Sequence, residues 1–274
     1  MVMLDVFLVQ MDCGNFDKVR SLLSKANLQK KTPADEQVNG LIVLPEMFAT
    51  GYIPEKPSNY AENFSNAEAG ATAKFLSELA NETGCAVMGA GIGIGREGKL
   101  RNHSSVYLPG QTIEYSSYDK IHPFFPEQAK FKGGESVSLF EINGWKISSA
   151  ICYDLRFPEL FRDAVKKGAQ IITVQAAWPK IRIEHWETLL KARAIENQVY
   201  IVAVNGVTID GVSDNGTGSK NNAIALGGNS MIITPQGEII SRGSSDCEEI
   251  VHNSLDDVSL AEYRKVFPVL DGIV

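Results

Sequence analysis

The chain has 274 residues, of which 44% are hydrophobic and 22% charged, an ordinary composition for a globular protein with a sizeable core. Its net charge of −7 provides no basic surface for nucleic acid. No apolar run approaches the roughly 18 residues of a membrane span, and Met1–Met11 lacks the basic start of a signal peptide. We therefore expect a cytoplasmic protein with neither a membrane nor a nucleic-acid partner.

The first half of the chain mixes predicted strands and helices. Alternating or continuous apolar residues predict strands at Val2–Gln10, Gly40–Leu44 and Ala86–Ile94, and a hairpin of Ser104–Leu108 with Thr112–Ser117. Apolar residues at helical spacing predict helices over Phe16–Leu28 and Ala67–Thr83. Loops are predicted at Lys30–Asn39, Met47–Asn59 and Asp119–Glu135.

The second half contains the same mixture of elements. Strands are predicted at Ser136–Ile142, Lys146–Ile151, Gln170–Ala176 and Val199–Asn205, and helices over Phe161–Lys167 and Arg182–Asn197. A long loop, Gly206–Asn222, leads to a hairpin of Ser230–Ile233 with Glu238–Ser241 and a last strand at Glu249–His252. Helices separate some strands and hairpins join others. We therefore expect an α/β fold with mixed sheets covered by helices, in a single domain over residues 1–274.

Cys152 occupies the corner between the strand Lys146–Ile151 and the helix-start signals at Asp154 and Pro158. A thiol beside a helix N-terminus meets a partial positive charge and unpaired N–H groups, which favour the thiolate and can hold an oxyanion. This position makes Cys152 a candidate nucleophile. A lone cysteine is more often a buried structural residue, so this segment alone leaves both interpretations open.

The other cysteines, Cys13, Cys85 and Cys247, are scattered, with no Cys-x-x-Cys pair and no histidine at metal-ligand spacing. This spacing predicts neither a disulfide framework nor a metal site.

Two charged residues also follow predicted strands. Glu46 follows Pro45 at the end of the apolar run Gly40–Leu44, where a partly buried carboxylate could act as a general base. Lys120 follows the hairpin that ends near Ser117. Taken alone, each could be a solvent-exposed charge. Because functional groups gather at the carboxyl ends of strands in α/β sheets, we expect both side chains to converge with Cys152.

Three segments, in this order, resemble the signature segments of the nitrilase (carbon–nitrogen hydrolase) superfamily: Leu44-Pro-Glu46-Met, Tyr118-Asp-Lys120-Ile-His and Ile151-Cys152-Tyr-Asp-Leu-Arg156-Phe-Pro-Glu159. The resemblance covers nearly the whole chain and implies a four-layer α-β-β-α sandwich without a cofactor. It implies that Glu46 is the general base, Lys120 the oxyanion stabiliser and Cys152 the nucleophile. It also suggests Glu127 as a second site glutamate and the N–H of Tyr153 as an oxyanion donor.

Within the superfamily, the segments Trp178–Trp186 and Lys191–Asn197 are most similar to the ω-amidase group, which hydrolyses the side-chain amides of 2-oxoglutaramate and 2-oxosuccinamate. Such a substrate carries a far carboxylate, and Arg182 or Arg156 could supply a two-pronged donor for it, with Trp178 nearby. A surface arginine at a helix start would explain Arg182 equally well. One departure is Gly206, which stands where relatives often have an arginine.

Other functions stay open. The same residues would serve an N-carbamoyl hydrolase or a nitrilase. A papain-like cysteine hydrolase with His122 as its base belongs to a different class, but the chain lacks that family's cysteine near the N-terminus. A catalytically silent binding scaffold would have no need of all three catalytic residue types. The resemblance further implies a homodimer or a higher homo-oligomer, with the apolar tail at about residues 255–274 in its interface.

Overall fold

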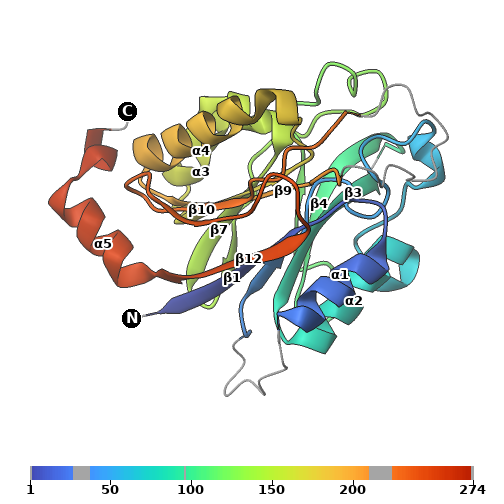
Figure 1. Cartoon of the computed structure of the whole chain (residues 1–274), viewed down its shortest axis with the longest axis horizontal. Helices are drawn as coiled ribbons and strands as arrows, with labels where there is room; N and C mark the ends of the chain where they lie inside the picture. Colours follow the sequence, from blue (N-terminus) through green and yellow to red (C-terminus); the bar gives the residue numbers. More distant parts are fainter. Residues whose placement is uncertain (1, 27–37, 96, 210–223, 273–274) are drawn as a thin grey trace.

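The computed structural model describes residues 2–26, 38–95, 97–209 and 224–272. Its strands form two six-stranded sheets (Figure 1). Sheet 1 has the order β12 (Glu249–Asp256), β1 (Met3–Gln10), β2 (Leu41–Val43), β3 (Ala86–Ile94), β4 (Leu100–Tyr107) and β5 (Ser116–Asp119). Sheet 2 has the order β11 (Ile239–Arg242), β10 (Met231–Ile233), β9 (Tyr200–Asn205), β8 (Ile171–Ala176), β7 (Trp145–Ile151) and β6 (Phe140–Ile142).

The centre of each sheet is parallel, with β1, β2 and β3 in sheet 1 and β7, β8 and β9 in sheet 2. Parallel neighbours need crossover connections. Four helices provide them: α1 (Phe16–Lys25), α2 (Ala71–Thr83), α3 (Pro158–Lys166) and α4 (Ile183–Asn197). In Figure 1, α1 and α2 cover the outer face of sheet 1, and α3 and α4 cover that of sheet 2. The predicted four-layer α-β-β-α sandwich is thereby confirmed.

Three apolar layers hold this sandwich together. In β2, Leu41 faces the opposite sheet and the next residue, Ile42, packs under α1 and α2. In β9, Val202 faces the space between the sheets and Ile201 packs under α3 and α4. Burying one such side chain contributes about 1.5–3 kcal/mol. Because both faces are covered, these strands read in the sequence as continuous apolar runs.

The predicted helix Ala67–Thr83 is divided at Gly70. The carboxylate of Glu62 accepts hydrogen bonds from the backbone N–H groups of Thr72 (3.0 Å) and Ala73 (3.2 Å), which satisfies the N-terminus of α2. A side chain at position 70 would overlap this carboxylate. Glycine therefore allows Glu62 to reach the helix end.

Several element bounds differ from those predicted. Strands β5 and β6 are shorter, because the first residues of the predicted segments belong to loops. Helix α3 begins earlier, at Pro158, since proline suits the first turn of a helix. Short 3-10 helices that the sequence did not predict are η1 (Pro57–Asn59), η2 (Ala67–Ala69), η3 (Cys152–Arg156), η4 (Lys180–Arg182) and η5 (Val269–Gly272).

The last strand is longer than predicted. Strand β12 continues to Asp256 because it pairs antiparallel with all of β1, from Met3 opposite Asp256 to Gln10 opposite Glu249. The Asp256 side chain then accepts a hydrogen bond from the backbone N–H of Val258 (2.9 Å) and caps α5 (Asp257–Val266), which was not predicted. This pairing joins the two ends of the chain in one sheet.

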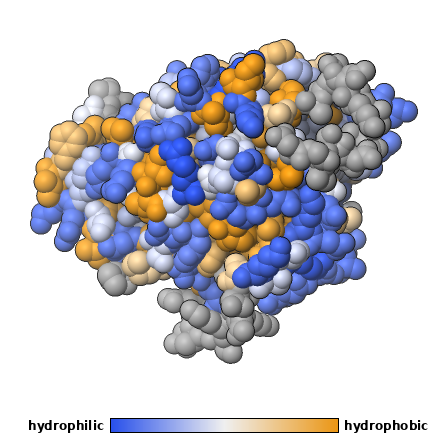
Figure 2. Space-filling model, viewed as in Figure 1, coloured by the Kyte–Doolittle hydropathy of each residue, from blue (hydrophilic) through white to orange (hydrophobic). Residues whose placement is uncertain are grey.

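Two predicted features fall largely outside the described residues: residues 27–37, with the end of the first helix and most of Lys30–Asn39, and residues 210–222 of the long loop. Among the helices that are described, none is long and apolar enough to cross a membrane. Figure 2 shows a largely hydrophilic face with apolar surface in places, including the end of the molecule where α5 lies. Near that end, Val266 is 82% exposed and Phe267 is 57% exposed.

Candidate active site

Glu46, Lys120 and Cys152 meet at one end of the space between the sheets. Each follows the carboxyl end of a strand: Glu46 comes after β2, Lys120 after β5 and Cys152 after β7. Strands β2 and β5 run in the same direction, since β5 and β3 are both antiparallel to β4 and β2 is parallel to β3. The expected convergence at strand ends therefore results from the direction of the strands.

Glu46 is held by donors from both sheets. Its Oε1 accepts hydrogen bonds from Lys120 Nζ (2.8 Å) and Asn102 Nδ2 (2.7 Å), and its Oε2 accepts one from the backbone N–H of Ala177 (2.9 Å). The carboxylate is completely buried. An ionised carboxylate offers about four lone-pair directions. One direction on Oε2 therefore remains for a proton or a further donor.

The ammonium of Lys120 lies between two buried carboxylates. Its Nζ is 2.8 Å from Glu46 Oε1 and 2.8 Å from Glu127 Oε2, and Glu127 is also anchored by the backbone N–H of Phe124 (2.9 Å). Burial lowers the pKa of Lys120, but the surrounding anionic groups, led by Glu46, raise that pKa well above its usual value. Lys120 is therefore a fixed positive charge. Burial also raises the pKa of Glu127, against the opposing charge of Lys120.

Cys152 begins η3 with a φ of +47°. This conformation is strained for a residue with a side chain and persists only where the surroundings enforce it. The residue is 7% exposed. Burial raises the pKa of its thiol well above the usual value, the charge of Glu46 adds to this effect, and the charge of Lys120 opposes it. The resting sulfur is therefore a thiol. Burial therefore opposes the thiolate that the start of a helix favours.

Tyr153 is packed against the loop that carries Glu127. Its ring centre lies 5.1 Å from that of Phe124 and 5.4 Å from that of Phe157. The residue after Cys152 is thus fixed on two sides. The role of its backbone N–H as an oxyanion donor stays a prediction.

The residues predicted to contact the substrate surround the end of β8. Trp178 is buried, and its indole Nε1–H donates a hydrogen bond to the backbone oxygen of Arg182 (2.8 Å). The guanidinium of Arg156 lies 4.9 Å from the centre of the Trp178 ring, a cation–π contact. The Arg182 side chain is exposed and forms no hydrogen bond or ion pair with the described part of the chain. Arg156 is thus engaged with the Trp178 ring, whereas the Arg182 guanidinium has no such contact among the described residues.

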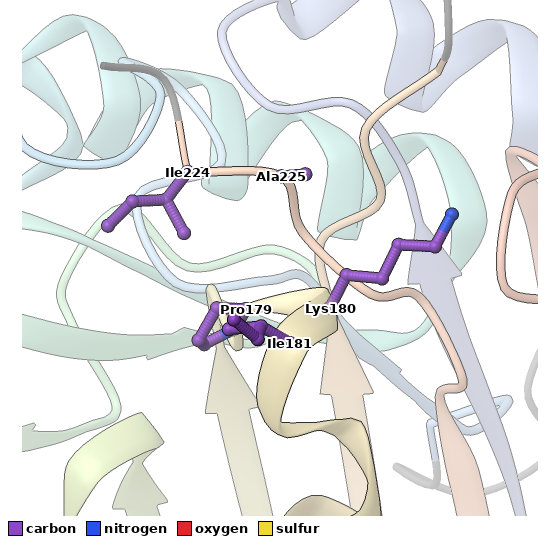
Figure 3. Close-up of a pocket in the computed structure, with 5 residues that line it drawn as sticks. All are labelled: Pro179, Lys180, Ile181, Ile224 and Ala225. Carbon is purple, nitrogen blue, oxygen red and sulfur yellow. The ribbon is translucent and has the colours of Figure 1, made fainter.

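A pocket of about 510 Å³ opens beside this strand end (Figure 3). Its lining residues are Pro179, Lys180, Ile181, Ile224 and Ala225. Its walls are joined by a hydrogen bond from the backbone N–H of Lys180 to the backbone oxygen of Ala225 (2.8 Å). In Figure 3 the Lys180 side chain extends away from the two isoleucines, so the lining is mainly apolar. The pocket adjoins the residues that follow β8.

Three groups at the site were not predicted from the sequence. Asn102 is a polar residue within β4, the Ala177 contact uses a backbone N–H, and Tyr52 lies in the loop after Glu46. Burial raises the pKa of the Tyr52 phenol, and the charge of Glu46 is the next cause. The only sequence signal was Asn102, a polar side chain on the buried face of a strand.

The arrangement suits attack by sulfur on a carbonyl carbon. It combines a thiol, a carboxylate with a free lone-pair direction and a fixed ammonium, in a site largely closed to water. No set of three or more His, Cys, Asp or Glu side chains within the described ranges could hold a metal ion.

The carbon-nitrogen hydrolase family model matches residues 8–265. The chain belongs to this family. This carbon-nitrogen hydrolase is 34% identical over 240 residues to 2-oxoglutaramate amidase of Bacillus subtilis (strain 168), an alignment that covers 85% of this chain and 84% of the relative. It is 32% identical over 241 residues to Omega-amidase YafV of Escherichia coli (strain K12), covering 85% and 86% of the two chains.

A crystal structure of similar fold is that of XC1258 from Xanthomonas campestris, a CN-hydrolase superfamily protein with an arsenic adduct in its active site. It superposes with a TM-score of 0.83 and 29% identity, covering 100% of this chain and 98% of the other. The predicted superfamily is thus confirmed, and the chain is an amide-hydrolysing enzyme of this family.

The papain-like alternative is not supported. The Nδ1 of His122 lies 2.9 Å from Asp154 Oδ1, and the charged neighbours of Cys152 are instead Glu46, Lys120 and Glu127. A carboxylate rather than an imidazole therefore lies beside the sulfur in this carbon-nitrogen hydrolase.

Proposed function

We propose that this enzyme hydrolyses small ω-amides with a far carboxylate, such as 2-oxoglutaramate, to the acid and ammonia through a thioester on Cys152. The observation that carries the chemistry is Glu46, which is anchored by three hydrogen bonds and keeps one lone-pair direction of Oε2 open in the same cluster as the thiol. The names of the similar amidases from Bacillus subtilis and Escherichia coli support the substrate class.

In the first half of the reaction, Glu46 accepts the thiol proton as Cys152 Sγ bonds to the amide carbon. Because the resting sulfur is a thiol, this transfer must accompany attack. The negative charge that develops on the substrate oxygen is stabilised by the Lys120 ammonium and the backbone N–H of Tyr153. The C–N bond then breaks, Glu46 returns the proton to the leaving nitrogen, and ammonia departs.

In the second half, water replaces ammonia. Glu46 takes a proton from the water molecule while the water oxygen attacks the thioester carbon, and the C–S bond breaks. The acid leaves, and the proton on Glu46 returns to the sulfur. The net reaction is amide plus water to acid plus ammonia. Glu127 holds Lys120 in place throughout, through both of its carboxylate oxygens.

A panel of substrates tests this function. We would measure ammonia release from 2-oxoglutaramate, 2-oxosuccinamate, an N-carbamoyl amine and a small nitrile, with Cys152→Ala as the blank. The proposal expects the ω-amides to have the highest kcat/KM. A preference for the carbamoyl amine or the nitrile would reassign the substrate within the family. Failure to turn over any of them would point to the silent scaffold.

A further inference from the structure

Asp154, two residues after Cys152, has a completely buried carboxylate that accepts four hydrogen bonds. Its Oδ2 accepts from the Tyr118 hydroxyl (2.7 Å) and the backbone N–H of Ile151 (3.0 Å). Its Oδ1 accepts from both the backbone N–H and the ring Nδ1 of His122, each at 2.9 Å. All of the roughly four lone-pair directions of an ionised carboxylate are therefore used.

These four bonds connect two segments that are separate in the sequence. Ile151 directly precedes Cys152, so its bond to Asp154 closes the turn around the strained nucleophile. Tyr118 and His122 stand two positions before and two positions after Lys120. One carboxylate thus ties the backbone on either side of the lysine to the turn that carries the thiol.

His122 is fixed from two directions. An ionised aspartate only accepts hydrogen bonds, so the Nδ1 that faces it must carry the hydrogen. The ring also stacks on Phe157, with centres 3.7 Å apart and planes 6° from parallel. Phe157 follows η3 and donates its backbone N–H to the Asp154 backbone oxygen (3.0 Å). Both contacts of the imidazole are therefore with the turn that begins at Cys152.

We propose that Asp154 and His122 are positioning residues that hold Cys152 in register with Lys120; this inference rests on the function proposed above. The hydrogen bonds of Asp154 use all of its lone-pair directions, and the partners of both residues lie in the segments that carry the reacting groups. A displacement of about 1 Å between reacting groups can cost roughly 100-fold in rate. Losing the His122–Asp154 bond should therefore lower kcat more than it raises KM.

Two substitutions separate the hydrogen bond from the stacking. His122→Phe keeps a ring on Phe157 and removes the donor, whereas His122→Asn keeps a donor near the Nδ1 position and removes the ring. We expect kcat to fall about 10- to 100-fold in His122→Phe, with KM changed less than about threefold, and to recover most of this loss in His122→Asn. His252→Phe is the matched control, because His252 also stacks on a phenylalanine, Phe7, and pairs with an aspartate, Asp5, at the exposed end of sheet 1. Its kcat should match wild type.

A kcat within about twofold of wild type in His122→Phe would overturn the positioning role, and so would equal losses in His122→Phe and His122→Asn that track their unfolding midpoints. If His122→Phe does not fold, Tyr118→Phe removes another bond to Asp154 and should also lower kcat. Its control is Tyr115→Phe, whose hydroxyl bonds to the Glu141 backbone oxygen (2.9 Å). Full activity in Cys152→Ala would refute the proposed function itself, whereas an inactive Cys152→Ala beside an unaffected His122→Phe would refute only the positioning role.

Discussion

The Nζ of Lys120 lies 2.8 Å from Oε1 of Glu46, and neither side chain has any solvent exposure. Burying two charges costs several kcal/mol per ion, and an apolar pair of similar volume is often at least as stable. The pair is therefore poorly explained as a stabilising device. The Glu46–Lys120 pair lies beside a strained cysteine, and shifted charges of this kind are typical of functional sites.

The first prediction concerns the nucleophile. Cys152→Ala and Cys152→Ser should each lower kcat by about 1,000-fold or more while the fold is kept, because neither side chain supplies a thiol. Mass spectrometry during turnover of the wild type should detect an acyl adduct on the peptide that contains Cys152. An adduct on Cys13, Cys85 or Cys247 instead would remove Cys152 from the mechanism.

The second prediction concerns the two charged residues of the buried pair, Glu46 and Lys120. Glu46→Gln should abolish turnover, because a neutral amide cannot accept the thiol proton, while Lys120 keeps its contacts with Glu127. Lys120→Met should abolish turnover and also destabilise the fold by about 3–5 kcal/mol at neutral pH, since two buried carboxylates lose their counter-charge.

The stability of Lys120→Met should depend on pH, and the raised pKa of Glu127 gives the direction. Burial already raises the pKa of Glu127, and loss of the lysine charge raises it further. When the pKa of a carboxyl group is raised in the folded state, the folded protein loses stability as pH rises through that pKa. The variant should therefore regain stability on acidification. Urea unfolding at about pH 7.5 and about pH 5 measures this. An equal loss of unfolding free energy relative to wild type at both pH values would contradict the idea that uncompensated carboxylates destabilise the variant.

The third prediction uses the raised pKa of the thiol. Because iodoacetamide needs the thiolate, alkylation of Cys152 should be slow near neutral pH and still rising above pH 9, the ordinary value for a thiol. A Cys247→Ser background removes the exposed cysteine. Glu46→Gln should speed the reaction and Lys120→Met should slow it, since these charges act in opposite directions. A rate that levels off below about pH 8 would instead indicate a resting thiolate.

The proximity of Glu46 and Cys152 could be predicted from the sequence because apolar runs end near both residues. Cys152 directly follows β7 and Glu46 comes three residues after β2, and the carboxyl ends of these two strands lie at the same end of the space between the sheets. Ala177 could not be predicted, since a backbone N–H leaves no mark on the residue type. Strand β12 was predicted too short because its length depends on pairing with β1 at the other end of the chain. The raised pKa of the Cys152 thiol could not be predicted either, because burial is a tertiary property that the local pattern does not contain.

The fourth prediction is a homodimer or a higher homo-oligomer that buries the C-terminal segment. Val266 and Phe267 are 82% and 57% exposed in the isolated chain, which is unusual for neighbouring large apolar residues. Light scattering at micromolar concentration should give at least twice the monomer mass, and Phe267→Asp should lower it. Ile94→Asp, at a 50% exposed position at the end of β3, is the control and should not change the mass. A monomeric wild type would refute the prediction.

The last prediction identifies the cation that receives the far carboxylate. Arg156 already lies over the Trp178 ring, whereas the Arg182 side chain is exposed and without an ion-pair partner among the residues described. Trp178 also holds the backbone of Arg182 through its indole N–H, which places the arginine next to the strand end that anchors Glu46.

A charged hydrogen bond contributes about 1.5–3 kcal/mol. Arg182→Ala should therefore raise KM for 2-oxoglutaramate about 10- to 100-fold and leave KM for an uncharged amide of equal length nearly unchanged. Arg182→Lys should recover only part, because an ammonium cannot make the two-pronged contact. Equal effects on both amides would make Arg182 structural, and the same charge-selective effect in Arg156→Ala, but not in Arg182→Ala, would assign the carboxylate to Arg156.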